Sequence, residues 1–186
     1  NQTLPIELKE RPTILVVGEN AIKMMTVGGG SSSLKAKYEI SPLQGIQERA
    51  AGLAEVKYVR GYVGDIGGEY NGVTTGQSLQ DDRTPQQLTA EAVEAAKSAD
   101  YVIFVGGMNK AHNQDCEDGD RLHYELPYGQ DQLISALAAV NDKVVFVSIS
   151  GNAHGMPWSE EVGAILQAWY SGSETGHAVA DVLFGD

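Results

Sequence analysis

The chain has 186 residues, of which 42% are hydrophobic and 20% are charged. This length suits one domain, and the composition is that of a soluble globular protein rather than a disordered chain. The formal net charge of -12 and the isoelectric point near 4.6 would repel phosphate backbones and anionic membranes, which argues against nucleic-acid and membrane partners.

Five short runs rich in β-branched and aromatic residues predict strands. In chain order they are residues 13–17, 56–59, 101–105, 144–149 and 164–169. The first, third and fourth runs are apolar nearly throughout, so both faces of these strands should be covered. Helical patterns alternate with the strands at residues 41–53, 84–99, 128–140 and 174–184. The pairs Ser41-Pro42 and Thr84-Pro85 are typical starts for the first two helices.

This alternation predicts a single α/β domain. We expect an open, mainly parallel sheet of about five or six strands with helices on both faces, a flavodoxin-like three-layer sandwich. Ligands of such sheets bind outside the carboxyl ends of the strands. Three connections exceed what packing requires, namely residues 28–37, 61–83 and 106–125. They indicate a site or an interface at that edge of the sheet.

The connection over residues 106–125 is strongly polar and contains the densest group of charges in the chain: Asp115, Glu117, Asp118, Asp120 and Arg121. A carboxyl group crowded by other carboxylates keeps its proton to higher pH, as a general acid near neutrality requires. An adjacent arginine can pair with one carboxylate and hold the segment in place. The alternatives are a solvated acidic surface or a weak cation site, and spacing alone favours the solvated surface.

Other motifs carry weaker signals. The segment GGGSSS at residues 28–33 could bind phosphate through backbone N–H groups, but it lacks the Walker and dinucleotide spacings, which favours a glycine-rich connector. The four histidines and Cys116 show no zinc spacing, so we assign no metal, and a single cysteine excludes an internal disulfide. Trp158 and Trp169 could stack on a sugar, although core or interface packing is the commoner use.

The motifs occur in an informative order. ILVVGENA and GGGSSS come first, followed by EAVEAAKSADYVIFVGG, CEDGDR and LPYGQDQLISAL, and then by VVFVSISGNAHGMPW and QAWYSGSETGHAVADVLFGD. Nearly end to end, this order resembles the C-terminal α/β sandwich domain of glycoside hydrolase family 3, the family of β-glucosidases and exo-glycosidases.

The resemblance implies a retaining β-glycosidase whose active site is shared by two domains. In this family an aspartate nucleophile lies on a preceding TIM-like barrel, and the acid/base carboxylate comes from the α/β domain. Alignment of Asp120-Arg121 with the end of the family pattern E-G-x-D-R places Glu117 at the acid/base position. Asp118 then replaces the usual glycine, and Asp115 is the reserve candidate. Asp120 and Arg121 would hold the segment in place.

The resemblance also places Gly29, Gly30 and Ser31 at the pocket rim, as contacts for substrate or for the barrel. It implies a carbohydrate substrate, a β-glucoside or related sugar, and no cofactor. The 186 residues contain neither the barrel nor a fibronectin-like tail, so we expect this fragment to be inactive alone and its parent to be soluble, with periplasmic or secreted export left open. Two other functions stay open: a stand-alone flavodoxin-like nucleotide-binding module and a non-catalytic sugar-binding domain.

Overall fold

The computed structural model describes residues 3–26, 31, 34–64, 69–70, 73–74, 76–111, 113–117 and 121–186. Five parallel strands form one sheet in the order β2-β1-β5-β6-β7. Their bounds are Thr13–Val17 (β1), Glu55–Val59 (β2), Tyr101–Gly107 (β5), Val144–Ile149 (β6) and Ala164–Gln167 (β7). Helices are α1 (Pro42–Arg49), α2 (Pro85–Ala96), α3 (Gln130–Ala138) and α4 (Thr175–Phe184), with a short 3-10 helix η1 (Glu19–Ala21). The predicted α/β fold is confirmed.

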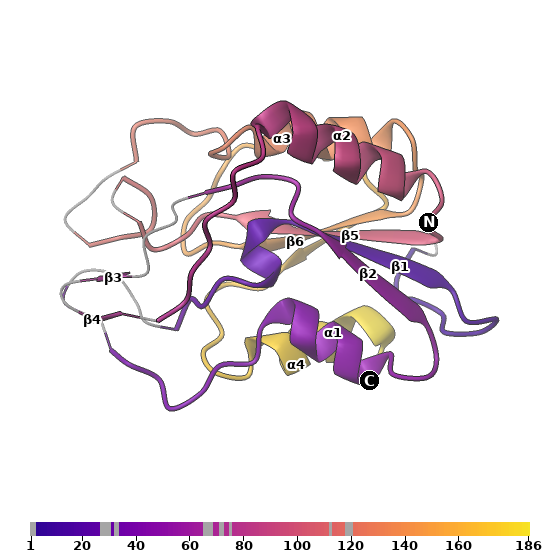
Figure 1. Cartoon of the computed structure of the whole chain (residues 1–186), viewed down its shortest axis with the longest axis horizontal. Helices are drawn as coiled ribbons and strands as arrows, with labels where there is room; N and C mark the ends of the chain where they lie inside the picture. Colours follow the sequence, from indigo (N-terminus) through magenta and orange to yellow (C-terminus); the bar gives the residue numbers. More distant parts are fainter. Residues whose placement is uncertain are drawn as a thin grey trace.

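The helices lie in two layers, one on each face of the sheet. Figure 1 shows α2 and α3 above the strands and α1 and α4 below them. Side chains that follow one another along a strand point to opposite faces. In β5, Val102 and Phe104 belong to the core beneath α2 and α3, while Ile103 and Val105 belong to the core against α1 and α4. This explains why the central strands are apolar at every position.

The predicted helix starts are formed as expected. The Ser41 hydroxyl accepts a hydrogen bond from the backbone N–H of Gln44 at 3.2 Å, and Thr84 and Gln87 cap α2 reciprocally. The helix ends differ more. Helix α1 ends at Arg49, before the predicted residue 53, and α3 begins at Gln130 because Gly129 adopts a left-handed conformation with φ of 72°.

Helices α1 and α4 pack unusually closely at two glycines. A Cβ atom added to Gly45 of α1 would lie 2.1 Å from the carbonyl oxygen of Gly176 in α4. No real side chain fits at that distance, so hydrogen is the only substituent that this crossing accepts. The sequence predicted both helices but gave no sign of this contact.

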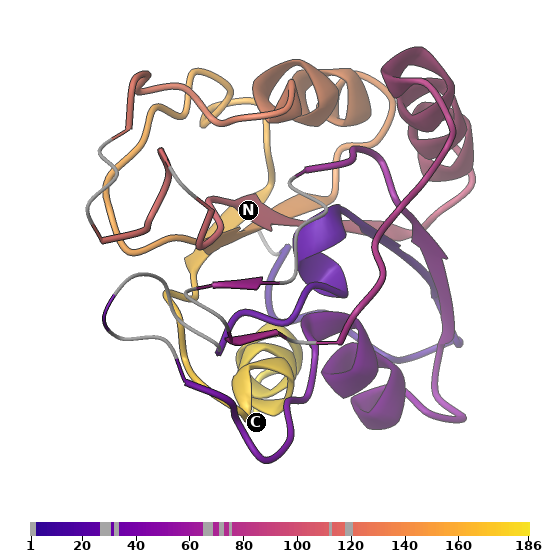
Figure 2. The same cartoon turned by 60° about the vertical axis from the view of Figure 1, so that its left-hand side comes forward.

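The described parts of the long connections gather at the edge where the strands end. Figures 1 and 2 show them on the same side of the molecule as the small antiparallel pair β3 (Glu69–Tyr70) and β4 (Val73–Thr74). We expected only a loop there. Strand β7 ends at Gln167 rather than at residue 169, since Trp169 takes a left-handed φ of 56°. No helix in the described part of the chain combines the length and apolarity needed to cross a membrane.

Candidate functional site

The sheet has a topological switch point between β1 and β5. From β1 the chain passes to α1 on one face of the sheet, and from β5 it passes to α3 on the other face (Figure 1). Such a switch point is the usual ligand site of this sheet order. Here it is filled by η1. The Asn20 side chain donates a hydrogen bond to the carbonyl of Met108 at 2.8 Å, which joins η1 to the end of β5.

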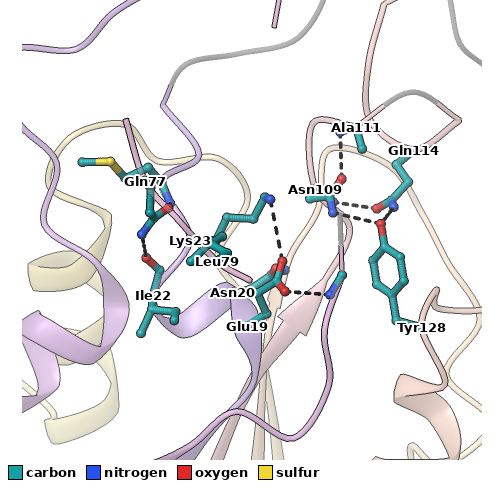
Figure 3. A network of polar contacts seen from close by, with 12 residues as sticks. Glu19, Asn20, Ile22, Lys23, Gln77, Leu79, Asn109, Ala111, Gln114 and Tyr128 are labelled. Atoms are coloured by element: carbon teal, nitrogen blue, oxygen red, sulfur yellow. Dashed lines mark hydrogen bonds and ion pairs between the residues drawn. The ribbon is translucent and has the colours of Figure 1, made fainter. Parts of the chain in front are cut away.

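The buried charged side chains of Glu19, Lys23 and Arg60 also occupy the switch point. Figure 3 shows Glu19 and Lys23. The Glu19 carboxylate is fully buried and accepts hydrogen bonds from the Arg60 guanidinium at 2.8 Å and from the Gly64 N–H at 2.6 Å. The Lys23 ammonium lies 3.7 Å from its other oxygen. The three charged side chains are buried and paired with one another, so this part of the edge is built for structure.

The connection after β5 is held by polar side chains at its beginning. Asn109 accepts the Ala111 N–H at 2.7 Å through its side chain, and its own backbone N–H donates to the Gln114 side chain at 2.9 Å. Both the Asn109 and Gln114 amides donate to the Tyr128 hydroxyl next to α3 (Figure 3). These contacts tie Asn109, Ala111 and Gln114 to one another and to Tyr128 before the acidic segment begins.

Asp115, the first carboxylate of that segment, is engaged through both oxygens. One oxygen accepts the Gly151 N–H at 2.6 Å and the Tyr170 hydroxyl at 2.7 Å. The other accepts the Asn152 side-chain amide at 2.7 Å. Its partners come from the connections after β6 and β7, so Asp115 joins three connections at the carboxyl edge.

Glu117, two residues further, is exposed. Its carboxylate accepts a hydrogen bond from the Ser31 N–H, so these two residues, 86 positions apart in the sequence, lie side by side. The pKa of Glu117 is lowered, first by the Ser31 side chain and then by its N–H. We expected crowding to raise this pKa. The difference arises because hydrogen bonds to an exposed carboxylate favour its ionised form.

An open cleft of about 500 Å³ lies between these residues. It is lined by Lys110, Gln114, Asp115, Cys116, Glu117, Arg121, Gly151, Asn152 and Tyr170. The Arg121 guanidinium donates to the carbonyl of Ala153 at 2.5 Å, which ties the far end of the acidic segment to the connection after β6. The lining is mostly polar, so its side chains can donate and accept hydrogen bonds.

Lys110 and Tyr170 form one wall of the cleft. The ammonium of Lys110 lies 3.7 Å from the centre of the Tyr170 ring, a cation–π contact. Burial lowers the pKa of Lys110, while the negative charge of Asp115 acts in the opposite direction. Both residues also line a smaller cavity of about 120 Å³ beside Trp169.

The remaining residues considered for the site either are not described by the structure or lie away from the cleft. Gly29, Gly30 and Asp120 lie outside the described residues, as does Asp118. Trp158 is fully buried and donates its indole N–H to Asp131 at 2.7 Å, so it is a core residue. Trp169 is 58% exposed. Among the described residues no group of three or more His, Cys, Asp or Glu side chains could hold a metal ion.

Sequence reasoning missed four residues of the cleft: Lys110, Gln114, Asn152 and Tyr170. Each follows a predicted strand, which is the position where the fold places ligands. That signal was available, but it does not distinguish these residues from other polar residues in the same long connections.

Comparison with known proteins identifies the family. The model of the family described as "Glycosyl hydrolase family 3 C-terminal domain" matches residues 1–186. "Beta-glucosidase BoGH3A" of Bacteroides ovatus is 46% identical over 189 residues, which cover 98% of this chain and 24% of that protein. The chain thus spans about a quarter of the length of this relative.

Solved structures of β-glucosidases contain a domain with the same fold. A β-glucosidase from Kluyveromyces marxianus has a TM-score of 0.86 at 21% identity, with 100% of this chain and 37% of that chain covered. A GH3 β-glucosidase from Bifidobacterium adolescentis has a TM-score of 0.78 at 30% identity, covering 100% of this chain and 24% of that chain. The first likeness concerns the fold alone, and the family match covers the full length. The chain therefore belongs to the C-terminal domain family of glycosyl hydrolase family 3.

Proposed function

We propose that this chain is the acid/base-bearing domain of a retaining β-glycosidase that hydrolyses β-glucosides or related sugars, with Glu117 as the acid/base. A barrel domain of the same polypeptide would supply the nucleophile and most of the sugar contacts. Family membership supports the β-glycosidase class, because the relatives above are β-glucosidases by name.

One observation carries the choice of residue. The two candidate carboxylates lie on the same segment and line the same cleft, but their surroundings differ. Asp115 accepts three hydrogen bonds from its own chain, whereas Glu117 is exposed. An acid/base must exchange its proton with substrate and then with water. The exposed Glu117 carboxylate accepts hydrogen bonds from Ser31 but stays accessible to substrate and water, whereas both oxygens of Asp115 are occupied by its own chain.

The proposed chemistry has two steps. Glu117 first protonates the leaving glycosidic oxygen while a nucleophile, about 5 to 5.5 Å away in retaining enzymes, attacks the anomeric carbon. The resulting Glu117 carboxylate then removes a proton from the water that hydrolyses the covalent intermediate. The first step needs protonated Glu117. Loss of the Ser31 hydrogen bonds, or the approach of the nucleophile's negative charge, would raise its pKa in that direction.

A nucleotide-binding function fits this chain poorly. The switch point that would receive the phosphate of a flavodoxin-like protein is filled by η1 and by the buried Glu19 carboxylate. A non-catalytic sugar-binding function would use the same cleft without proton transfer. The two sugar-related functions differ in what replacement of Glu117 does to the rate.

The test uses the polypeptide encoded by the complete gene and two β-glucosides, one with a dinitrophenyl leaving group and one with an alkyl leaving group. Glu117→Gln should lower kcat/KM for the alkyl glucoside by about 10²- to 10⁴-fold, since departure of a poor leaving group needs a proton. The dinitrophenyl glucoside should be affected far less, and azide should restore its turnover. The 186-residue chain alone should show no turnover.

Glu160→Gln is a matched control, because it makes the same carboxyl-to-amide change at an exposed glutamate that does not line the cleft. It should keep the wild-type rates on both substrates. Equal rates for Glu117→Gln and wild type on the alkyl glucoside would move the acid/base role away from residue 117. Strong turnover by the pure chain alone would contradict the shared active site.

A further inference from the structure

We propose that Asp115 is a positioning residue that fixes Glu117 over the cleft, acting together with Tyr170. This inference rests on the proposed role of Glu117 and adds a second group of residues to it. It rests on the set of contacts that reach Asp115 from two other connections.

The distance along the chain makes the effect of Asp115 direct. Only one residue separates Asp115 from Glu117, and two extended residues span at most about 7 Å. The backbone N–H of Asp115 donates to the carbonyl of Asn109 at 3.1 Å, so the segment before it is closed into a turn. Fixing the Asp115 carboxylate therefore restricts where the Glu117 carboxylate can reach.

Tyr170 supplies the contact from the most distant connection. Its hydroxyl lies 2.7 Å from Asp115 and 3.3 Å from the Asn109 carbonyl, so it bridges both ends of the turn. The Lys110 ammonium lies over the Tyr170 ring at 3.7 Å. The ring is thus held between a cation on its face and a carboxylate at its hydroxyl.

The pattern of donors suggests what an isosteric change would do. Tyr170 and Gly151 donate to the same Asp115 oxygen, which an asparagine could keep as its amide oxygen. The other oxygen faces the side-chain amide of Asn152, and that amide can rotate to present its own oxygen. Asp115→Asn can therefore retain all three contacts, whereas Asp115→Ala removes them.

The experiment is a double-mutant cycle in the complete polypeptide, measured as kcat/KM on the alkyl and dinitrophenyl glucosides. Asp115→Ala should lower the rate on the alkyl glucoside by about 100-fold, the effect of misplacing a catalytic group by about 1 Å. The dinitrophenyl glucoside should lose much less. Asp115→Asn should keep most of the rate. In the Glu117→Gln background, Asp115→Ala should cost nothing further, because the group that it positions is already gone.

Tyr170→Phe removes one hydroxyl and keeps the ring, so it tests the inference even where Asp115→Ala fails to fold. It should lower the rate on the alkyl glucoside by about tenfold, as one hydrogen bond to a charged group predicts, and this loss should also vanish in the Glu117→Gln background.

Three outcomes would overturn the inference in distinguishable ways. Equal losses for Asp115→Asn and Asp115→Ala, with azide rescue of both, would make Asp115 itself the acid/base. A loss on Asp115→Ala or Tyr170→Phe that is the same with and without Glu117 would mean that these residues act through the general fold. Full activity of Glu117→Gln would remove the proposed function and this inference together.

Discussion

Two carboxylates at the carboxyl edge of one sheet have opposite surroundings. Glu19 is fully buried at the β1–β5 switch point and is paired with Arg60 and Lys23. Glu117 is exposed beside an open cleft at the ends of β5 and β6. The usual ligand position of this fold is thus used for structure, and the candidate chemistry lies one strand further along. Sheet order alone does not locate a site, because the side chains at the switch point decide whether it is open.

The largest effect that would test this comparison concerns Glu19. Glu19→Ala leaves the buried Arg60 guanidinium without its carboxylate, so the free energy of unfolding should fall by about 3–5 kcal/mol. Glu117→Ala should change it by less than about 0.5 kcal/mol, since the residue is exposed. Urea denaturation of the 186-residue chain, followed by circular dichroism, measures both. Similar losses in the two variants would show that the regions do not differ as described.

A second prediction concerns the proton affinity of Glu117. The Ser31 hydrogen bonds favour the ionised carboxylate and lower its pKa. Ser31→Ala removes the hydroxyl, so the pKa of Glu117 should rise towards its ordinary value. Carboxyl NMR titration of the isolated chain reports this pKa directly. Ser31→Thr keeps a hydroxyl and is the control. An unchanged or lower pKa in Ser31→Ala would mean that the contact between the two segments does not form in solution.

The smallest expected effect concerns the pH dependence of stability at His177, which lies away from both Glu19 and Glu117. His177 of α4 bonds to Glu48 of α1 at 2.7 Å and to Glu174 at 2.6 Å, and these bonds raise its pKa above 6.5. A raised folded-state pKa stabilises the fold at pH values below the unfolded value, and this contribution disappears as the pH rises through the folded value. His177→Gln should therefore be less stable than wild type at about pH 5.5 and equal to it at about pH 9, measured by thermal unfolding. A difference independent of pH would contradict this assignment.

Local patterns predicted most of the fold. The bounds of β1 and β6 agree with the apolar runs at residues 13–17 and 144–149, because these strands are buried on both faces and the pattern is unambiguous. The end of β7 was wrong by two residues, since an aromatic residue at position 169 looks like a strand residue and gives no sign of its left-handed backbone. The β3–β4 pair was missed because each strand has only two residues.

The site was less predictable because its contacts are distant in sequence. The partners of Asp115 are 36, 37 and 55 residues away, and Arg60 is 41 residues from Glu19. Composition and spacing show that carboxylates occur together in residues 115–120, but they do not show which of them has partners. Alignment to the family pattern points to Glu117, but the hydrogen bonds that distinguish the two carboxylates exist only in the folded chain.

The close crossing of α1 and α4 has a consequence for the order in which the chain can fold. Helix α1 has eight residues and includes Gly45, so an isolated peptide of this sequence would be largely unfolded in water. Its partner surface is centred on Gly176 of α4, which follows α1 with the rest of the sheet in between. During synthesis on the ribosome this layer must wait until the chain between Gly45 and Gly176 has been made. Until then one face of the sheet stays uncovered, and a nascent chain stalled before α4 would be a natural substrate for chaperones.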